Sequence, residues 1–173
     1  MNDLFEVLIA WQEISTSTSS VTSVPNPLKF LRAHYGTLKA HYETMADLEL
    51  KKHLANILSV LAFTMSEKGE QESLKYRLLG SEGDIGSCGY QYVRNLTVEI
   101  KDELVKSESE EKPIVDLLGL VGQIVAFRMK YNAEPEAVDL LVQAKATNRL
   151  LPYVDSRNYT RTCLYLTSVA RSI

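Results

Sequence analysis

Residues 50–65 read LKKHLANILSVLAFTM, and this stretch has the clearest helical pattern in the chain. Its apolar residues recur at spacings of three and four, which places them on one face of an α-helix. They are Leu50, Leu54, Ile57, Leu58, Leu61 and Met65. Lys51, Lys52 and His53 lie off this stripe, and Asp47 is a favourable N-cap just upstream. The stretch therefore predicts an amphipathic helix that buries one face.

The segments on both sides repeat the helical period, and none shows the alternation of a β-strand. The Ser/Thr-rich run at 15–23 favours a loop, because hydroxyl side chains compete for backbone hydrogen bonds. Gly36 is a candidate break inside the second helix. Helices are expected at 3–14, at 27–45, after Asp47, around Leu74–Leu79, around Tyr92–Leu104, from Pro113, from Pro135 and after Asp155.

The expected helix ends follow from known capping residues. Gly80 ends the helix that contains Leu74 and Leu79, and Asn132 is a candidate C-cap. Pro135 suits a first-turn position, and Asp155 or Ser156 caps the last helix. About eight helices joined by short turns predict an all-α fold, an irregular antiparallel helical array of the α-solenoid kind.

The whole chain, 1–173, is expected to form a single helical domain. Residues 106–112, KSESEEK, are the candidate for a mobile acidic connection within it. No exact internal repeat is present, which disfavours a regular tetratricopeptide or ankyrin array.

Composition excludes several classes of protein. The chain has 45% hydrophobic and 24% charged residues and a formal net charge of -3, whereas a nucleic-acid binder needs clustered Lys and Arg. No apolar run is long enough to cross a bilayer, and residues 1–14 lack the features of a signal peptide. Cys88 and Cys163 are expected to be free thiols in a reducing compartment.

Residues 80–89, GSEGDIGSCG, have glycine at every third position and raise the question of a phosphate-binding loop. A P-loop requires Lys and then Ser or Thr after its last glycine, but here Tyr90 and Gln91 follow. The segment also follows a helix rather than a strand. It is interpreted as a link between two helices, with Asp84 or Ser87 as the next N-cap and the glycines supplying positive-φ turns.

No constellation of residues indicates an enzyme. His34, His41 and His53 have no cysteine or carboxylate at zinc-ligand spacing, and neither cysteine has a nearby histidine in sequence. Glu110 and Glu111 belong to a charge run of the kind that is usually solvated. We therefore expect no catalytic, cofactor-binding or metal-binding residue, and the sequence names no partner-binding residue.

Four collinear stretches resemble the N-terminal region of the largest non-ATPase subunit in the base of the 26S proteasome regulatory particle, non-ATPase regulatory subunit two. They lie at 17–45 (STSSVTSVPNPLKFLRAHYGTLKAHYETM), 50–96, 123–141 (QIVAFRMKYNAEPEAVDLL) and 161–168 (RTCLYLTS). The resemblance covers 15–173 and implies a non-enzymatic scaffold in ubiquitin-dependent protein degradation, cytoplasmic and nuclear. Its implied partners are the ATPase ring and other base subunits, with no nucleic acid and no membrane. The repeats that dock ubiquitin and ubiquitin-like receptors in that family have no counterpart here.

The chain also departs from the family pattern. Where the family reads GSWGHEYVRHL, Cys88 replaces the tryptophan, Tyr90 the histidine and Gln91 the glutamate, and Ala33 replaces a proline. Loss of a buried tryptophan is expected to leave a void or force repacking. Two alternatives follow: an excised fragment of such a subunit, or a short diverged paralogue that does not assemble into the proteasome. A generic helical interaction module is a further alternative.

Overall fold

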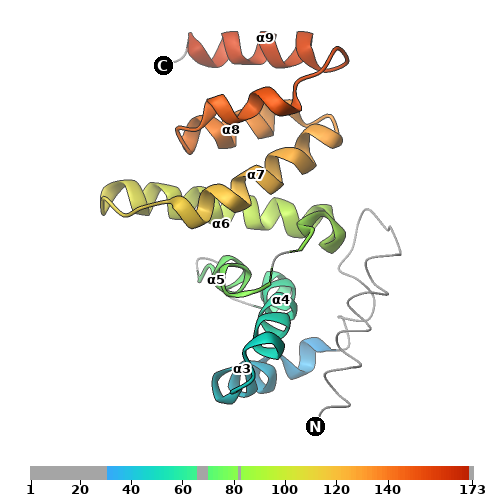
Figure 1. The fold of residues 1–173 in the computed structure, drawn as a ribbon, viewed down its shortest axis with the longest axis vertical. Coiled ribbons are helices and arrows are strands. Elements are labelled where there is room, and N and C mark those ends of the chain that lie inside the picture. Colours follow the sequence, from blue (N-terminus) through green and yellow to red (C-terminus); the bar gives the residue numbers. More distant parts are fainter. Residues whose placement is uncertain (1–30, 66–69, 82, 172–173) are drawn as a thin grey trace. The chain divides into compact units, whose positions relative to one another are not determined.

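The computed structural model describes residues 31–65, 70–81 and 83–171. This part of the chain contains α-helices and short 3-10 helices and no strand, which confirms the all-α prediction (Figure 1). The helix expected at 3–14 and the loop expected at 15–23 lie outside the described residues. The described elements are η1 (Arg32–His34), α3 (Tyr35–Thr44), α4 (Leu48–Met65), α5 (Glu72–Leu79), η2 (Ile85–Cys88), α6 (Tyr90–Ser109), α7 (Val115–Lys130), α8 (Glu134–Gln143), η3 (Thr147–Tyr153) and α9 (Tyr159–Ala170).

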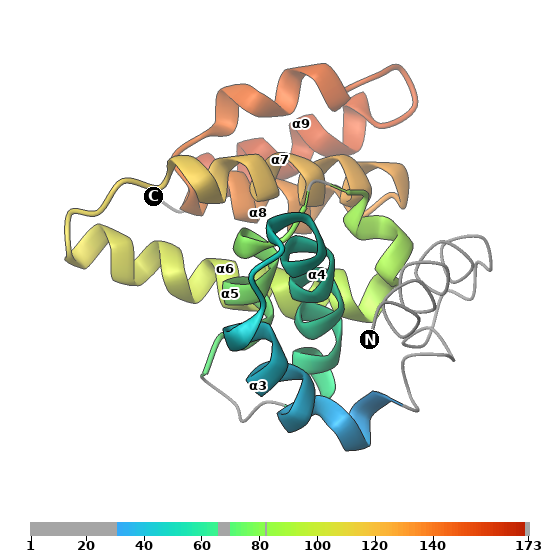
Figure 2. The same ribbon diagram turned by 60° about the horizontal axis from the view of Figure 1, so that its bottom comes forward.

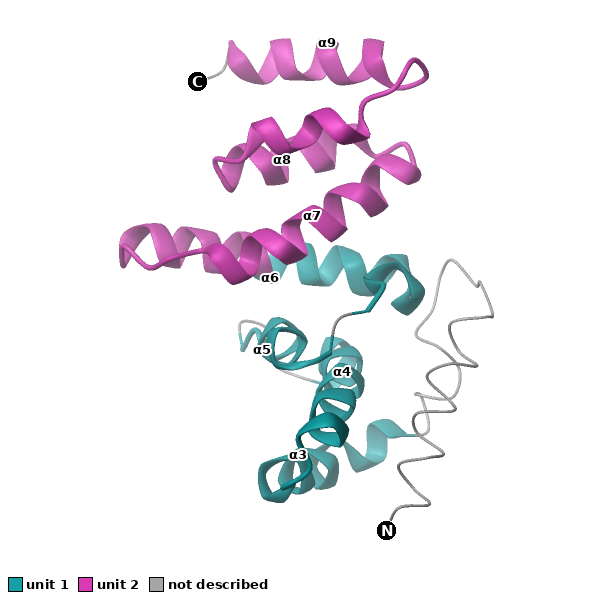
Figure 3. Cartoon of the chain, in the orientation of Figure 1, with its two compact units in different colours: residues 1–99 teal, residues 100–173 magenta. Residues whose placement is uncertain are grey.

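The chain divides into two compact units, residues 1–99 and 100–173 (Figure 3). The boundary falls inside α6, so that one continuous helix belongs to both units. In unit 1, residues 1–99, α3 lies beside α4 in both views, and α5 packs on α4 (Figures 1 and 2). In unit 2, residues 100–173, α7 packs on α8, and α8 packs on α9 and η3.

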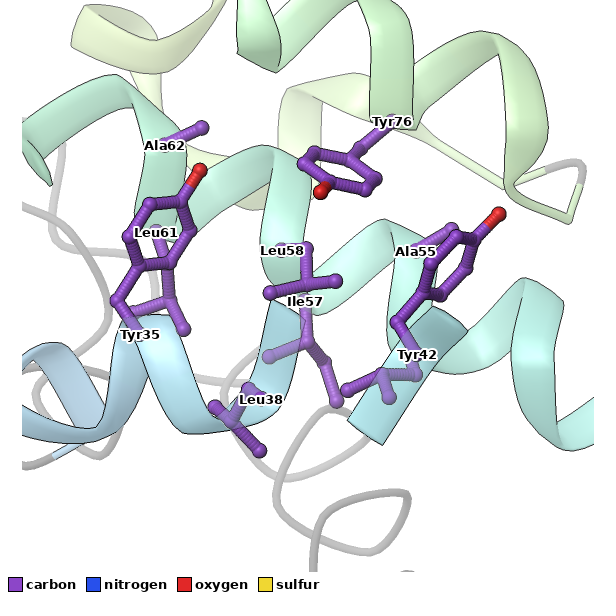
Figure 4. Packing of buried hydrophobic residues seen from close by; sticks show 10 residues of the cluster. Tyr35, Leu38, Tyr42, Ala55, Ile57, Leu58, Leu61, Ala62 and Tyr76 are labelled. Atoms are coloured by element: carbon purple, nitrogen blue, oxygen red, sulfur yellow. The ribbon is translucent and has the colours of Figure 1, made fainter. Parts of the chain in front are cut away.

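The core of unit 1 is built around α4. Tyr35, Leu38 and Tyr42 of α3 pack against α4, and Tyr76 of α5 joins the same cluster (Figure 4). The rings of Tyr42 and Tyr76 meet edge to face with centroids 5.4 Å apart, an arrangement that aromatic quadrupoles favour. The cluster therefore holds three consecutive helices together.

Helix α4 is buried more completely than its sequence predicts. The predicted stripe is buried from Leu54 to Leu61, but every residue from Leu54 to Ala62 is buried, including Asn56 and Ser59. Hydrogen bonds accommodate the buried Ser59 hydroxyl. Its Oγ donates to the Ser73 carbonyl at 2.6 Å and lies 2.7 Å from the Tyr92 hydroxyl. The expectation of a single buried face was too narrow, because α5 packs on α4 in addition to α3, and Tyr92 of α6 reaches Ser59.

Unit 2 has its own apolar core. The periodic residues of α7 and α8 are buried as their spacing predicts: Leu117, Leu120, Val121, Ile124, Val125, Val138, Leu140 and Leu141. Ile100 and Leu104 of α6 are also buried. In addition, the Gln143 side chain donates to the Lys101 carbonyl at 2.9 Å and joins the end of α8 to α6.

Several predicted helix ends are confirmed. The Asp47 side chain accepts hydrogen bonds from the backbone N–H groups of Glu49 and Leu50 at 3.0 and 3.1 Å. The C-cap of α7 is Tyr131, so that the predicted C-cap Asn132 is wrong by one residue. Asn132 follows with a positive φ of 56°, and the Ala133 N–H returns to the Arg128 carbonyl at 2.9 Å. This is a Schellman ending. Pro135 lies in the first turn of α8.

Other predicted ends are wrong. Gly36 does not break the second helix, because α3 runs through it and the discontinuity lies at His34, between η1 and α3. Neither Asp155 nor Ser156 is the N-cap of α9, which begins later, with Asn158 in that position. Asp155 instead closes the preceding turn by accepting the N–H groups of Arg157 and Asn158.

The acidic connection expected at 106–112 is shorter in the structure, because α6 continues to Ser109. The helix ends there through a hydrogen bond from the Lys112 N–H to the Ser107 carbonyl at 2.9 Å. Among the helices of the described residues, none combines the length and apolar character that a membrane span requires.

Candidate interaction surface

The residues with chemical potential are dispersed over separate elements. His34 is exposed in η1, His41 is half-buried in α3, and His53 is half-buried in α4. Cys88 in η2 and Cys163 in α9 are free thiols. Within the described ranges, no three or more His, Cys, Asp or Glu side chains are grouped so that they could hold a metal ion.

The glycine-rich stretch connects two helices, as predicted. Gly80 is the C-cap of α5, Asp84 caps η2 by accepting the Gly86 N–H at 2.8 Å, and α6 starts directly after Gly89. The predicted role of the glycines is only partly right. Of the described glycines only Gly89 has a positive φ, 94°.

A buried arginine organises this stretch. Arg77 of α5 is buried, and its guanidinium donates to the Gly83 carbonyl at 2.5 Å and to Asn56 Oδ1 at 3.4 Å. Asn56 in turn donates to Ser81 Oγ at 2.7 Å. Burial raises the pKa of the nearby Cys88 thiol, so that it stays protonated at neutral pH. These contacts fix the path of the described part of the connection.

A second polar cluster joins α3 to α5. Tyr35 donates to Glu72 Oε2 at 2.6 Å, and the Lys39 ammonium forms an ion pair with the same carboxylate. Burial, together with the bond to Glu72, raises the pKa of Tyr35. Burial alone would raise the pKa of Glu72, but the bonds from Lys39 and Tyr35 outweigh it and lower that pKa. Tyrosine and carboxylate are thus held in opposite protonation states, which suits a structural clamp rather than proton transfer.

A shallow groove of about 500 Å³ lies between the start of α8 and one face of α9. Its lining is Asn132, Glu134, Pro135, Arg161, Leu164, Tyr165 and Ser168. The residues at 161, 164, 165 and 168 share one face of α9 because they are three or four apart. Arg161 pairs with the buried Glu134 carboxylate at 2.5 Å, and Tyr165 donates to Asp139 at 2.7 Å. The groove offers apolar walls with satisfied charges, a surface suited to receive side chains of another protein.

Exposed apolar side chains are the other candidate contact points. Among the large apolar residues that the structure describes, the most exposed are Leu151 at 76%, Val115 at 72%, Leu164 at 69% and Leu48 at 67%. In α9, Tyr159 and Leu164 are exposed, whereas Thr162 is buried. This helix carries apolar residues on more than one side.

Comparison with known proteins gives a consistent result. The family model for the RPN1 N-terminal domain matches residues 7–173, which begins earlier in the chain than the resemblance from Ser15. The 26S proteasome non-ATPase regulatory subunit 2 homolog A of Arabidopsis thaliana is 65% identical over 160 residues, covering 92% of this chain and 18% of that protein.

More distant relatives agree. The 26S proteasome non-ATPase regulatory subunit 2 of Dictyostelium discoideum is 49% identical over 154 residues, covering 89% of this chain and 17% of its own length. The 26S proteasome regulatory subunit rpn1 of Schizosaccharomyces pombe is 46% identical over 155 residues, 90% of this chain and 17% of that protein. The chain thus spans less than a fifth of the length of these relatives, and it belongs to the RPN1 N-terminal domain family.

Proposed function

We propose that this chain is a non-catalytic scaffold or regulatory component of the base of the 26S proteasome regulatory particle, which acts through protein–protein contacts in ubiquitin-dependent degradation. The observation that carries the proposal is the family match over residues 7–173 together with 65% identity to a proteasome regulatory subunit. The proposed partners are the ATPase ring and other base subunits. The proposed location is that of the proteasome, cytoplasm and nucleus.

The side-chain chemistry supports a contact role. The charged side chains of the clusters described above form bonds between helices, such as those of Glu72 with Tyr35 and of Glu134 with Arg161. Large apolar side chains, by contrast, remain exposed in both units, including Leu48 in unit 1 and Leu151 in unit 2. When a partner protein covers exposed apolar side chains, the loss of their contact with water favours binding.

The alternative is a diverged relative that does not assemble into proteasomes. Affinity purification separates the two. A tagged chain expressed beside a tagged full-length relative is expected to recover ATPase subunits and other base subunits. If the full-length relative recovers them and this chain does not, the assembled-subunit proposal is wrong.

Surface variants sharpen the test. Leu48→Asp, Leu151→Asp and Leu164→Asp each place a charge on an exposed apolar site and should leave the fold intact, as judged by circular dichroism. At least one is expected to reduce recovery of base subunits by tenfold or more, on the order expected for a contact hot spot. Thr160→Asp, at an exposed polar site of α9, is the matched control. Unchanged recovery by all three variants would contradict binding through these side chains.

A further inference from the structure

Helix α9 is held to its unit differently from the helices before it. The buried residues of α7 number seven and those of α8 five, whereas α9 buries only Thr162. Cys163, Tyr165, Leu166 and Val169 are half-buried. Since burial of apolar surface is the main source of docking free energy, α9 receives little of it.

The one fully buried side chain of α9 is also poorly suited to its site. Thr162 is 0% exposed, and its Oγ1 has no hydrogen-bond partner. Removing a hydroxyl from water without giving it a new hydrogen-bond partner is unfavourable, so its burial costs free energy when the helix docks. The hydroxyl at the centre of the α9 contact therefore makes docking less favourable.

Polar contacts on the flank of α9 compensate for its small apolar burial. Arg161 bonds Glu134 Oε1 through Nη2 at 2.5 Å and through Nε at 3.0 Å, and its Nη2 also lies 3.1 Å from Asn132 Oδ1. Tyr165 donates to Asp139 at 2.7 Å. Glu134 is only 2% exposed, whereas the Arg161 side chain is 53% exposed. The carboxylate is therefore removed from water and relies on Arg161 as its charged partner.

From these contacts we propose that α9 is a polar latch, which opens as a unit while α7 and α8 stay folded. A helix of 12 residues is marginal by itself in water, so that α9 unfolds once it leaves α8. Opening frees Arg161 and Tyr165 and dismantles the groove that they line. The latch therefore determines whether this groove is formed.

Native-state hydrogen exchange of the 173-residue chain, read by mass spectrometry at increasing low urea concentrations, tests the latch. Backbone amides of Cys163–Ala170 are expected to exchange at least about tenfold faster than those of Val138–Leu141, with a weaker dependence on urea. Equal rates and equal urea dependence would mean that α9 opens only with global unfolding, which overturns the proposal.

Three variants test the polar origin of the latch. Thr162→Val removes the unpartnered hydroxyl and is expected to slow exchange in α9 about five- to tenfold, while exchange in α7 is unchanged. Thr160→Val makes the same chemical change at an exposed site of the same helix and is expected to have little effect. Glu134→Gln weakens the pair with Arg161 and is expected to speed exchange in α9. Equal effects of Thr162→Val and Thr160→Val, or unchanged exchange in Glu134→Gln, would contradict the assignment.

Discussion

Gly80 has φ −78° and ψ 176°, a backbone conformation that any residue can adopt. It is required for a different reason. A Cβ at this position would lie 2.0 Å from Asn56 Oδ1 and 2.9 Å from Asn56 Cγ. Asn56 cannot easily move, because it is buried and bonded to Ser81 and Arg77. The end of α5 therefore needs glycine because of close packing.

Gly80→Ala is expected to destabilise the protein by about 1–3 kcal/mol, as overpacking does in a closed site. Gly83→Ala is the matched control, since a Cβ there meets no atom within 4 Å, and its effect should stay below about 1 kcal/mol. Urea unfolding followed by circular dichroism measures both. In the background of Asn56→Ala, the cost of Gly80→Ala should shrink. An unchanged cost would show that Asn56 is not the obstacle.

Glu72 predicts a pH dependence. Its pKa in the folded state lies below the ordinary value of 4.5, so the clamp with Lys39 and Tyr35 contributes stability above pH 4.5 and loses it as the pH falls through the folded pKa. The difference in unfolding free energy between the natural chain and Glu72→Gln should therefore shrink as the pH falls from about 6 to about 3.

Urea titrations at each pH measure this difference. Glu49→Gln is the control, because Glu49 is exposed and pairs only with the neighbouring Lys52 on the same helix. Its difference from the natural chain should be small at every pH. A constant difference for Glu72→Gln over the whole range would show that the carboxylate is not stabilised by the clamp.

At the scale of elements, the helix ends show which features the sequence can predict. Asp47 and Pro135 act where the sequence places them, because each has an intrinsic preference for that position. Glu111 and Lys145 also end helices with positive φ, 53° and 52°. Their residue types give no sign of it, because the left-handed conformation there is imposed by the Schellman hydrogen bonds and the following chain.

Lys145 offers a direct test of this imposed conformation. Lys145→Gly is expected to stabilise the protein by about 0.5–1 kcal/mol, because glycine adopts positive φ without steric cost. Lys145→Ala removes the same exposed pair with Glu108 but keeps the Cβ, and should change stability by less than about 0.5 kcal/mol. Thermal unfolding compares the two. Equal stability of the glycine and alanine variants would contradict strain at this position.

The candidate contact surface was less predictable than the helices. In α7 the helical period identifies most of the buried residues, because its apolar stripe is long. In α4 the period identifies only part of them, since Asn56 and Ser59 are buried as well. In α9, by contrast, the apolar Leu164 is exposed and the polar Thr162 is buried. Which apolar residues stay exposed depends on the helices that happen to cover them, and this information is not local to the segment.

At the scale of the whole molecule, helix α6 belongs to both units, and this is relevant to the prediction of a single domain. Tyr92, Val93 and Leu96 are buried in the part of α6 that belongs to unit 1, and Ile100 and Leu104 in the part that belongs to unit 2. Unfolding of either unit removes the packing of half of this helix, and a helix half exposed to water is marginal. We therefore expect the two units to unfold in one transition.

Leu58→Ala in unit 1 and Leu141→Ala in unit 2 each remove a fully buried side chain and should cost about 2–5 kcal/mol. For a chain of this length, each is expected to lower the midpoint of the same single thermal transition by roughly 4–20 °C. Differential scanning calorimetry provides the measurement, with Leu48→Ala at an exposed site as the control. If the natural chain shows two transitions and each core variant shifts only one of them, then α6 does not couple the units. The chain would then behave as two domains. A continuous helix couples the stability of two units only if the packing free energy of each of its halves is larger than the free energy needed to break the helix between them.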